Sequence, residues 1–400
     1  MNLRLALLTL CQGLLMVNNV VFIAINGLVG LALAPVGWMA TVPITAYVAG
    51  GALATGLVAR HQRRWGRQRT FQLGLLVAIC SAAVCAWAAM TRNFWLLTSA
   101  TLVAGYYSAN GSLYRFASVE LVQPDFKERA ISWVLAGGIL GGVVGPNLAS
   151  WSRDLLSQPF AGAYLALMGV GALSLAVMSC IPFPTLPGQG TTQLQGRPTA
   201  EIVRQPVFII AAAACAIGYG IMNLLMAATP IAMQMCGLPF SDAALVLEWH
   251  VIGMFAPGFF TGHLIKRFGT LPVMGTGLVL YGGCIAVALS GVDLHQFLVA
   301  LFLLGLGWNF VFTGSTTLSL GAYTPEEKDR AQGALNFFVF ATLALSSFAS
   351  GVLVTTSGWT LLNWGSVPLV AVMAGALLWL AAVNRRQAAA AADSARPASP

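Results

Sequence analysis

The sequence carries little charge. Asp, Glu, Lys and Arg make up 8% of its 400 residues, against about 25% in an ordinary soluble domain. Hydrophobic residues make up 58%, and the mean hydropathy is +0.80. So few charged side chains exclude an ordinary soluble enzyme or binding domain, and the composition indicates a membrane protein.

Several chemical signatures are also absent. The seven cysteines form no CxxC pair and have no histidine at ligand spacing, which argues against a metal site or a disulfide framework. The sequence has no GxxxxGKS or GxxxxGKT loop for ATP, and no apolar stretch carries the two acids that a metal-diphosphate enzyme needs on one face. The net charge of +8 lies in short runs between apolar stretches, unlike a nucleic-acid groove. We therefore predict no enzyme activity, no cofactor, no metal and no nucleic-acid partner.

Long apolar stretches dominate what is present. A helix that crosses a bilayer needs about 20 largely apolar residues. The first stretch begins like a secretory signal, MNLRLALLTLCQGLL, but continues to Ala34, so we interpret it as a membrane span. The sequence predicts an all-α integral membrane protein with twelve transmembrane helices, which start near residues 5, 38, 71, 95, 130, 162, 206, 243, 271, 296, 331 and 359.

The basic residues orient these spans. If twelve helices cross the membrane, all Lys and Arg lie on the side that holds both termini except Arg92, Arg153 and Arg115, and Arg115 lies within a span. Positive charge accumulates on the cytoplasmic side of membrane proteins. We therefore predict a multi-pass protein of the bacterial cytoplasmic (inner) membrane with both termini in the cytoplasm.

Two short stretches occur twice. QPDFKERA at 123–130 returns as TPEEKDRA at 324–331, and GLVARHQRRWG at 56–66 is echoed by GHLIKRFG at 262–269. The repeats predict two pseudo-symmetric six-helix bundles, 1–182 and 205–384, joined by a cytoplasmic linker at 183–204 that is rich in Pro, Gly, Thr and Gln. The Ala-rich end, 385–400, is predicted to be a disordered cytoplasmic tail. Parallel repeats of this kind build one class of secondary transporter.

With these motifs, residues 1–384 resemble the major facilitator superfamily of transporters. GLVARHQRRWGRQR is similar to the family's signature of Gly, three residues, Asp-Arg and Gly-Arg-Arg, although Arg60 stands where Asp is usual. GGILGGVVGP at 137–146 resembles the family's antiporter motif, and its glycines at every fourth position are also typical of close helix packing. The resemblance implies conformational gating at Gly56, Arg60, Gly66, Arg67, Arg129, Gly145, Pro146, Gly262, Lys266 and Arg330.

In this superfamily, spans 1, 4, 7 and 10 line a central cavity, and polar or aromatic residues gather in these spans here. Tyr107, Asn110 and Tyr114 share one helix face. Arg115 either contacts an anionic or carbonyl-bearing substrate or snorkels to the membrane surface. Rings with amides suit a flat, partly polar organic molecule, although some of these groups are expected to bond helix to helix instead. The candidate cavity residues are Asn18, Asn19, Tyr107, Asn110, Tyr114, Arg115, Asn223, Trp308, Asn309 and, in span 11, Asn336.

Glu248 and His250 lie in span 8, where a titratable group is costly unless it faces a cavity or a partner. We predict that they carry a coupled proton. The alternatives are a Glu that stays hydrated near the outer end of the span and a His that is a neutral core residue.

Together these features predict a monomeric secondary active transporter that moves a small organic solute by alternating access, coupled to protons. The alternatives are an uncoupled facilitator and a drug-type proton antiporter. YYSANGSLYRFASVE and EWHVIGMFAP resemble a bacterial branch of the family that includes uptake systems for riboflavin-like vitamins. A membrane enzyme, a receptor or a channel explains the paired loops less well.

Overall fold

A computed structural model describes residues 2–123, 127–183, 197–324 and 327–394, without the side chains of 63, 127–129, 132, 328, 329 and 387–394. All regular structure in these ranges is helical. In chain order the elements are α1 (Leu3–Leu33), η1 (Gly37–Met39), α2 (Val42–Met90), α3 (Phe94–Gly111), α4 (Tyr114–Ala117), η2 (Ser118–Leu121), α5 (Lys127–Ala136), α6 (Gly138–Ser152), α7 (Ala161–Ser179), α8 (Thr199–Val203), α9 (Pro206–Met235), α10 (Phe240–Phe255), α11 (Gly258–Phe268), α12 (Thr270–Ser290), α13 (Leu294–Ser319), η4 (Leu320–Ala322), α14 (Lys328–Thr356) and α15 (Gly358–Ser394).

Ten helices of the described chain are long and apolar enough to cross a membrane, or eleven if α10 and α11 form one span. These two are bent by 42° at a break next to Pro257, whose ring disrupts the helical hydrogen-bond ladder. The predicted span that this count leaves out is the one that starts near residue 95, and it corresponds to α3. This helix is 18 residues long and more polar than the others because it carries Tyr106, Tyr107 and Asn110. The all-α membrane fold is thus confirmed, while the number twelve stays a prediction.

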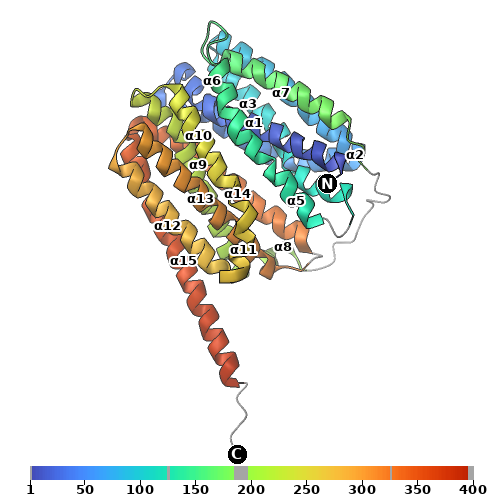
Figure 1. Ribbon diagram of the computed structural model, residues 1–400, viewed down its shortest axis with the longest axis vertical. Helices are drawn as coiled ribbons and strands as arrows, with labels where there is room; N and C mark the ends of the chain where they lie inside the picture. The colour runs from blue at the N-terminus through green and yellow to red at the C-terminus, as the bar shows by residue number, and fades with distance from the viewer. Residues whose placement is uncertain (1, 124–126, 184–196, 325–326, 395–400) are drawn as a thin grey trace, which may run out of the picture.

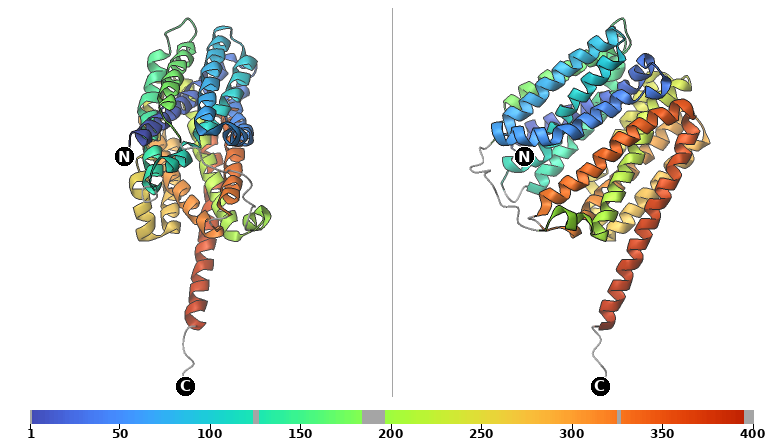
Figure 2. Two further views of the ribbon diagram at one scale, coloured as in Figure 1. Left: turned by 90° about the vertical axis from the view of Figure 1, so that its right-hand side faces the viewer. Right: turned by 180° about the vertical axis from the view of Figure 1, so that it is seen from behind.

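The helices form two bundles that differ in position along the chain. Figure 1 shows α1 to α7 on one side, in blue to green, and α9 to α15 on the other, in yellow to red. The views in Figure 2 show the same division. We call the end of the bundles that holds Gly66, the linker helix α8 and Gly269 the linker end, and the opposite end, with η1 and residues 153–160, the far end.

The two bundles touch each other at the far end. The backbone N–H of Gly351 donates to Oγ1 of Thr41 (3.1 Å), and the rings of Phe160 and Phe240 lie 4.8 Å apart. The hydrogen bonds between described residues of 2–182 and 205–384 lie at the far end, where Thr41 bonds to Phe348 and Gly351, or between α6 and α10, where Asn147 bonds to Glu248. The bundles diverge toward the linker end (Figure 1). The structure is therefore closed at the far end.

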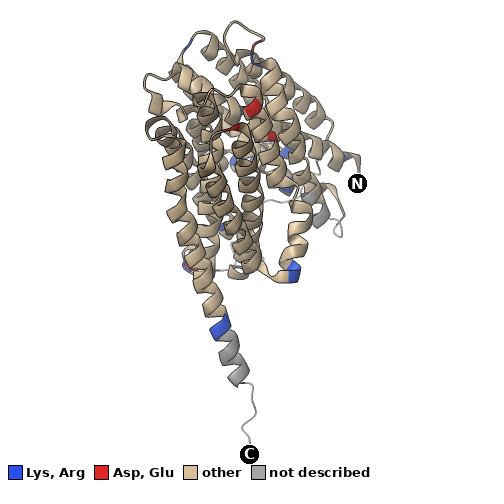
Figure 3. Cartoon of the chain, turned by 60° about the vertical axis from the view of Figure 1, so that its left-hand side comes forward, with Lys and Arg blue, Asp and Glu red and all other residues tan. Residues whose placement is uncertain are grey.

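Charge is sparse over the whole helical body, as Figure 3 shows. The structure differs from the prediction of a disordered tail at 385–400, because α15 continues as a helix to Ser394. Alanine has the highest helix propensity of any residue type. Because a run of alanines follows Gln387, the helix extends past the last apolar turn. Residues 395–400 lie outside the described residues.

Candidate functional site

A cavity lies between the two bundles, and both contribute to its wall. Its polar wall groups are Asn19, Tyr47 and Ser108 from the first half and Tyr219 and Asn223 from the second. The remaining wall is apolar, with four methionines and two phenylalanine rings. The lining residues are Met16, Asn19, Val20, Ile23, Ile44, Tyr47, Val48, Ser108, Tyr219, Met222, Asn223, Met226, Leu247, Val251, Met254, Phe255, Phe340 and Leu343.

The polar groups of the first half are held by one another. The hydroxyl of Tyr47 donates to Oδ1 of Asn19 (2.5 Å), and Nδ2 of Asn18 donates to the Tyr47 oxygen (3.3 Å). The ring of Tyr47 also packs at 4.9 Å against Phe22. Because the hydroxyl is fixed from two sides, Tyr47 and Asn19 present one rigid polar edge, and Asn18 supports it from behind.

An aromatic cluster forms the opposite wall. Tyr219 lies edge-on to Trp308 (5.1 Å) and Phe312 (5.5 Å), and Trp308 stacks on Phe312 at 4.8 Å. Trp308 also contacts Phe255 of the cavity wall (6.2 Å). Its indole Nε1–H is buried and makes no hydrogen bond to any described residue. A buried donor without a partner is costly, and Trp308 lies one contact behind the cavity wall, against Tyr219 and Phe255.

Asn223 has a structural role beside its place in the wall. Its Nδ2 donates to the hydroxyls of Ser346 (2.9 Å) and Ser347 (2.8 Å). These bonds tie α9 to α14 within the second half. Of the ten predicted cavity residues, Asn19 and Asn223 therefore line the cavity directly.

The predicted face of Tyr107, Asn110 and Tyr114 points elsewhere. All three side chains are buried in the first half: Tyr107 and Tyr114 belong to a core cluster with Cys11, and Tyr114 contacts the Phe71 ring at 4.9 Å. Asn110 donates to the carbonyl of Tyr106 in its own helix (3.1 Å). Tyr107 and Asn110 lie in α3, but α3 ends at Gly111 and Tyr114 begins α4, so one regular helix does not carry all three. In this conformation Tyr107 and Tyr114 pack in a core with residues of α1, α2 and α7, and a contact with substrate stays a prediction.

The other predicted cavity residues lie around the cavity without lining it. Asn309 accepts from Thr261 (2.6 Å) and donates to the carbonyl of Met254 (2.7 Å), so it joins helices of the second half. Asn336 is exposed on α14, one turn before Phe340. Arg115 is half-buried in α4, with its guanidinium 4.8 Å from the Phe116 ring. It is close enough to Tyr219 of the second half to interact with it electrostatically.

Glu248 and His250 face different partners. Glu248 of α10 accepts a hydrogen bond from Nδ2 of Asn147 in α6, 2.9 Å away in the other half. His250 is fully buried, and its Nδ1–H donates to the carbonyl of Leu301 in α13 (2.7 Å). Two residues along a helix lie about 200° apart, which explains why they do not act as a pair. Only Glu248 lies at the contact between the halves.

The glycines at the start of α6 and within it allow two neighbouring helices, α1 and α10, to approach closely. Gly137, Gly141 and Gly145 face α1, and a Cβ at Gly145 would lie 3.0 Å from Val20. The next face meets the other half: Cβ atoms at Gly138 and Gly142 would lie 3.3 Å from Phe255 and 2.9 Å from Val251. Together with the Asn147–Glu248 bond, this face forms what we call the α6–α10 seam. Pro146 is buried inside α6.

The predicted gating residues at the linker end are mostly exposed. Arg67 forms an ion pair with Glu120 (2.6 Å), within the first half. Gly66, where α2 bends, has φ +79° and ψ 173°, a conformation that is essentially restricted to glycine. The side chain of Arg129 lies outside the described residues. The remaining predicted positions, Gly56, Arg60, Gly262 and Lys266, are exposed to solvent or lipid.

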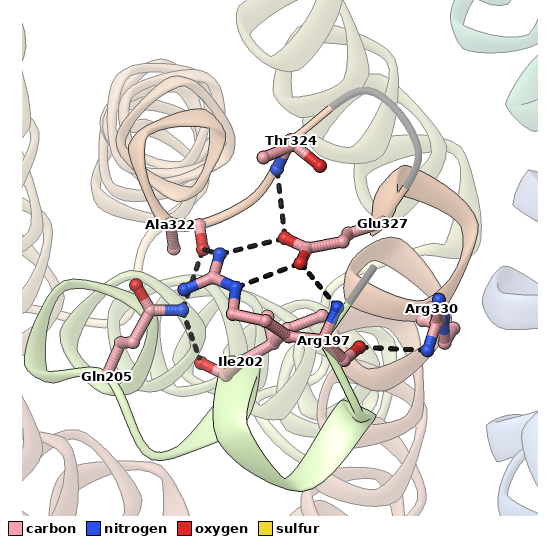
Figure 4. Close-up of polar contacts among 7 residues, drawn as sticks. All are labelled: Arg197, Ile202, Gln205, Ala322, Thr324, Glu327 and Arg330. Atoms are coloured by element: carbon pink, nitrogen blue, oxygen red, sulfur yellow. Dashed lines mark hydrogen bonds and ion pairs between the residues drawn. The ribbon is translucent and has the colours of Figure 1, made fainter. Parts of the chain in front are cut away.

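The end of the linker is held on the second half by one carboxylate (Figure 4). Arg197 donates from Nε (2.9 Å) and Nη2 (2.8 Å) to Glu327, and the Thr324 backbone N–H donates to the same group (3.0 Å). These hydrogen bonds hold the pKa of Glu327 well below its ordinary value. Arg330, a predicted gating residue, donates to the carbonyl of Arg197 (2.8 Å). We name this cluster the linker clamp.

Sequence reasoning missed Tyr47, Ser108 and Tyr219 in the cavity wall. A signal was present for Tyr219, which precedes Asn223 by four residues and therefore shares its helix face. Tyr47 lies in the second span, outside the four spans in which cavity residues were sought. The linker clamp was missed because its partners are 130 residues apart.

The chain matches known proteins over most of its length. The family model of the Major Facilitator Superfamily matches residues 5–256 and 223–400. The riboflavin transporter RfnT of Brucella anthropi is 38% identical over 372 residues, 92% of this chain and 94% of that protein. The 4-hydroxybenzoate transporter PcaK of Pseudomonas putida is 29% identical over 154 residues, 38% of this chain and 34% of that protein. The solved structure of the nucleoside transporter NupG has a TM-score of 0.73 at 14% identity and covers 94% of this chain and 99% of its own.

Proposed function

The chain belongs to the major facilitator superfamily, and we propose that it carries riboflavin, or a flavin-like solute, across the cytoplasmic membrane by alternating access. The observation that carries this proposal is the 38% identity to a riboflavin transporter over nearly the full length of both chains. The excess of Lys and Arg on the side of the termini supports cytoplasmic ends.

The chemistry of the cavity agrees with a flavin. A tricyclic ring needs flat apolar surfaces, and Tyr219 and Phe255 supply them on the second half beside flexible methionines. The carbonyl and imide groups of such a ring need a few fixed polar partners. The Tyr47–Asn19 edge, Ser108 and the free indole N–H of Trp308 are candidates for these contacts. Arg115, whose guanidinium lies over the Phe116 ring, is our candidate for attracting the polar side chain of the solute as it enters from the linker end.

Glu248 is our candidate for proton coupling. It is the acid that contacts the other half within the membrane helices described. Its carboxylate accepts from Asn147 in this conformation, which is closed at the far end. We expect opening of the far end to separate the two groups and protonation to weaken their bond. A ligand or proton shifts such an equilibrium only through this kind of differential contact. His250, which is bonded within its own half, has no corresponding role.

Uptake into proteoliposomes tests both statements separately. Radiolabelled riboflavin should accumulate in vesicles that contain the wild type, and its uptake should fall when unlabelled riboflavin competes, whereas 4-hydroxybenzoate should not compete. An imposed proton gradient should accelerate wild-type uptake but not that of Glu248→Gln, which keeps an acceptor for Asn147. If the wild type takes up no riboflavin, either with or without the imposed proton gradient, riboflavin is not the substrate. Gradient-independent uptake by the wild type refutes the coupling and leaves an uncoupled facilitator.

A further inference from the structure

The two halves carry the same structural corner at the linker end. In the first half the order is Arg64, Trp65 and Gly66, and in the second it is Arg267, Phe268 and Gly269. Both glycines have positive φ, +79° and +90°, and turn the chain into the next helix. We call these segments the arginine–aromatic corners.

In each corner the arginine lies over the aromatic ring that follows it. The guanidinium carbon is 6.0 Å from the ring centroid of Trp65 for Arg64, and 5.1 Å from that of Phe268 for Arg267. Both rings are large and apolar, yet Trp65 is 41% and Phe268 56% exposed. An exposed aromatic ring beneath a cation is suited to the boundary between lipid headgroups and acyl chains.

Trp65 is also fixed in place from within. The ring of His61 stacks on it at 4.4 Å with an angle of 27° between the planes. Nδ1 of His61 shares a hydrogen bond of 2.7 Å with the hydroxyl of Tyr106 in α3. The indole is therefore held in its exposed position by a chain of contacts that reaches into the first half.

Most cations around the corners have no carboxylate partner among the described residues. Arg60, Arg64 and Arg69 are exposed in the first half, and none of them forms an ion pair with a carboxylate in the described part of the chain. Their neighbour Arg67, by contrast, is paired with Glu120. Lys266 and Arg267 are exposed and equally unpaired in the second half. Each corner thus offers cations beside an oriented ring to a partner outside the protein.

We propose that the two arginine–aromatic corners bind the phosphate groups of anionic phospholipids in the leaflet at the linker end. Each cation near an anionic membrane surface contributes an attraction that corresponds to a factor of about five in affinity. The aromatic ring adds depth selectivity, because it inserts at headgroup level. One such site on each half anchors both bundles to the same leaflet while they move relative to each other. This inference is independent of the transported solute.

The test uses the purified full-length protein and measures lipid retention by native mass spectrometry and thermal stability in detergent. The probes are phosphatidylglycerol, phosphatidylcholine and inorganic phosphate. Phosphatidylglycerol should be retained and should raise the melting temperature, and phosphatidylcholine should not. The double variant Arg64→Gln/Arg267→Gln should weaken retention about 25-fold, which is about fivefold for each arginine.

The matched control is Arg385→Gln/Arg386→Gln, which removes the same charge from exposed positions near the end of α15. It should weaken retention less than the corner variant does, because in the described residues neither Arg385 nor Arg386 lies over an aromatic ring as Arg64 and Arg267 do. Equal losses in the two double variants, or equal retention of both lipids, would overturn the proposal. Stabilisation by inorganic phosphate alone to the same extent would replace it with a free-phosphate site. Trp65→Ala, which leaves every charge in place, should also lose retention if the corner rather than the charge is recognised.

Discussion

The hydrogen bond between Asn147 and Glu248 gives the sharpest test of how the halves are held together. It joins α6 to α10 across the seam at 2.9 Å. Asn147→Ala removes the donor and leaves Glu248 in place, so it should destabilise the conformation that is closed at the far end. Side-chain hydrogen bonds between membrane helices contribute about 0.6 kcal/mol on average and up to about 1.7, and bonds to charged groups are the stronger ones. We therefore expect a loss of about 1 kcal/mol, which corresponds to about a fivefold larger population open at the far end.

Thiol labelling can measure this population. In a background without the native cysteines, Ile23→Cys places a thiol in the cavity wall. A membrane-impermeant maleimide, added from the far side of sealed vesicles, reaches this thiol only when the far end opens. Asn147→Ala should accelerate the labelling about fivefold. Asn309→Ala is the control, because Asn309 bonds to Thr261 and Met254 inside one half. The reasoning fails if Asn147→Ala leaves the labelling rate unchanged, or if the control accelerates it equally.

Three further predictions follow from single residues. Trp308→Phe keeps the aromatic stack but removes the indole N–H, so riboflavin should bind about three- to tenfold more weakly in a fluorescence-quenching titration; unchanged affinity excludes this N–H as a contact. Glu327→Gln should lower the melting temperature above pH 4.5, which is the ordinary pKa of the carboxyl. The difference from the wild type should shrink as the pH falls below that value, because a group whose pKa is lowered in the folded state stabilises the protein only while it is ionised. A difference that grows toward acid pH contradicts the linker clamp. Gly66→Ala should reduce the free energy of unfolding by about 2 kcal/mol because of its positive φ, whereas Gly56→Ala, in open helical space, should not.

The sequence was sufficient for the all-α membrane fold and for the family. Apolar length and the distribution of Lys and Arg are properties that each span carries by itself, so they can be read without knowing the partners of a helix. The paired loops also indicated the duplication, and the equivalent turns at Gly66 and Gly269 lie where the echoed segments end. What a helix faces, by contrast, depends on its neighbours.

The predicted face of Tyr107, Asn110 and Tyr114 illustrates this limit. The spacing of Tyr107 and Asn110 fixes their common face in α3 but not its direction, and a buried face looks the same in a sequence whether it lines a cavity or a core. The break after Gly111, which places Tyr114 in α4, was not predicted. Tyr114 packs on Phe71, which is 43 positions earlier. The same limit applies to Glu248 and His250, whose closeness in sequence suggested a pair although the helix directs them to different bundles.

The two linker-end ion pairs show how the duplicated loops have diverged in use. The resemblance implied conformational gating at residues of these loops, but the ion pairs that the structure describes do not join the two halves. Arg67–Glu120 joins parts of the first half, and Arg197–Glu327 joins the linker to the second. Where Glu327 stands in the second loop, the first loop has Phe126 in the aligned sequence, so the carboxylate that the linker grips exists on one side only. In this conformation the charged pairs stiffen each unit, and the hydrogen bonds between the units in the described chain are those of Asn147 with Glu248 and of Thr41 with Phe348 and Gly351. A few bonds of about 1 kcal/mol or less each are weak enough for a solute or a proton to reverse, as alternating access requires.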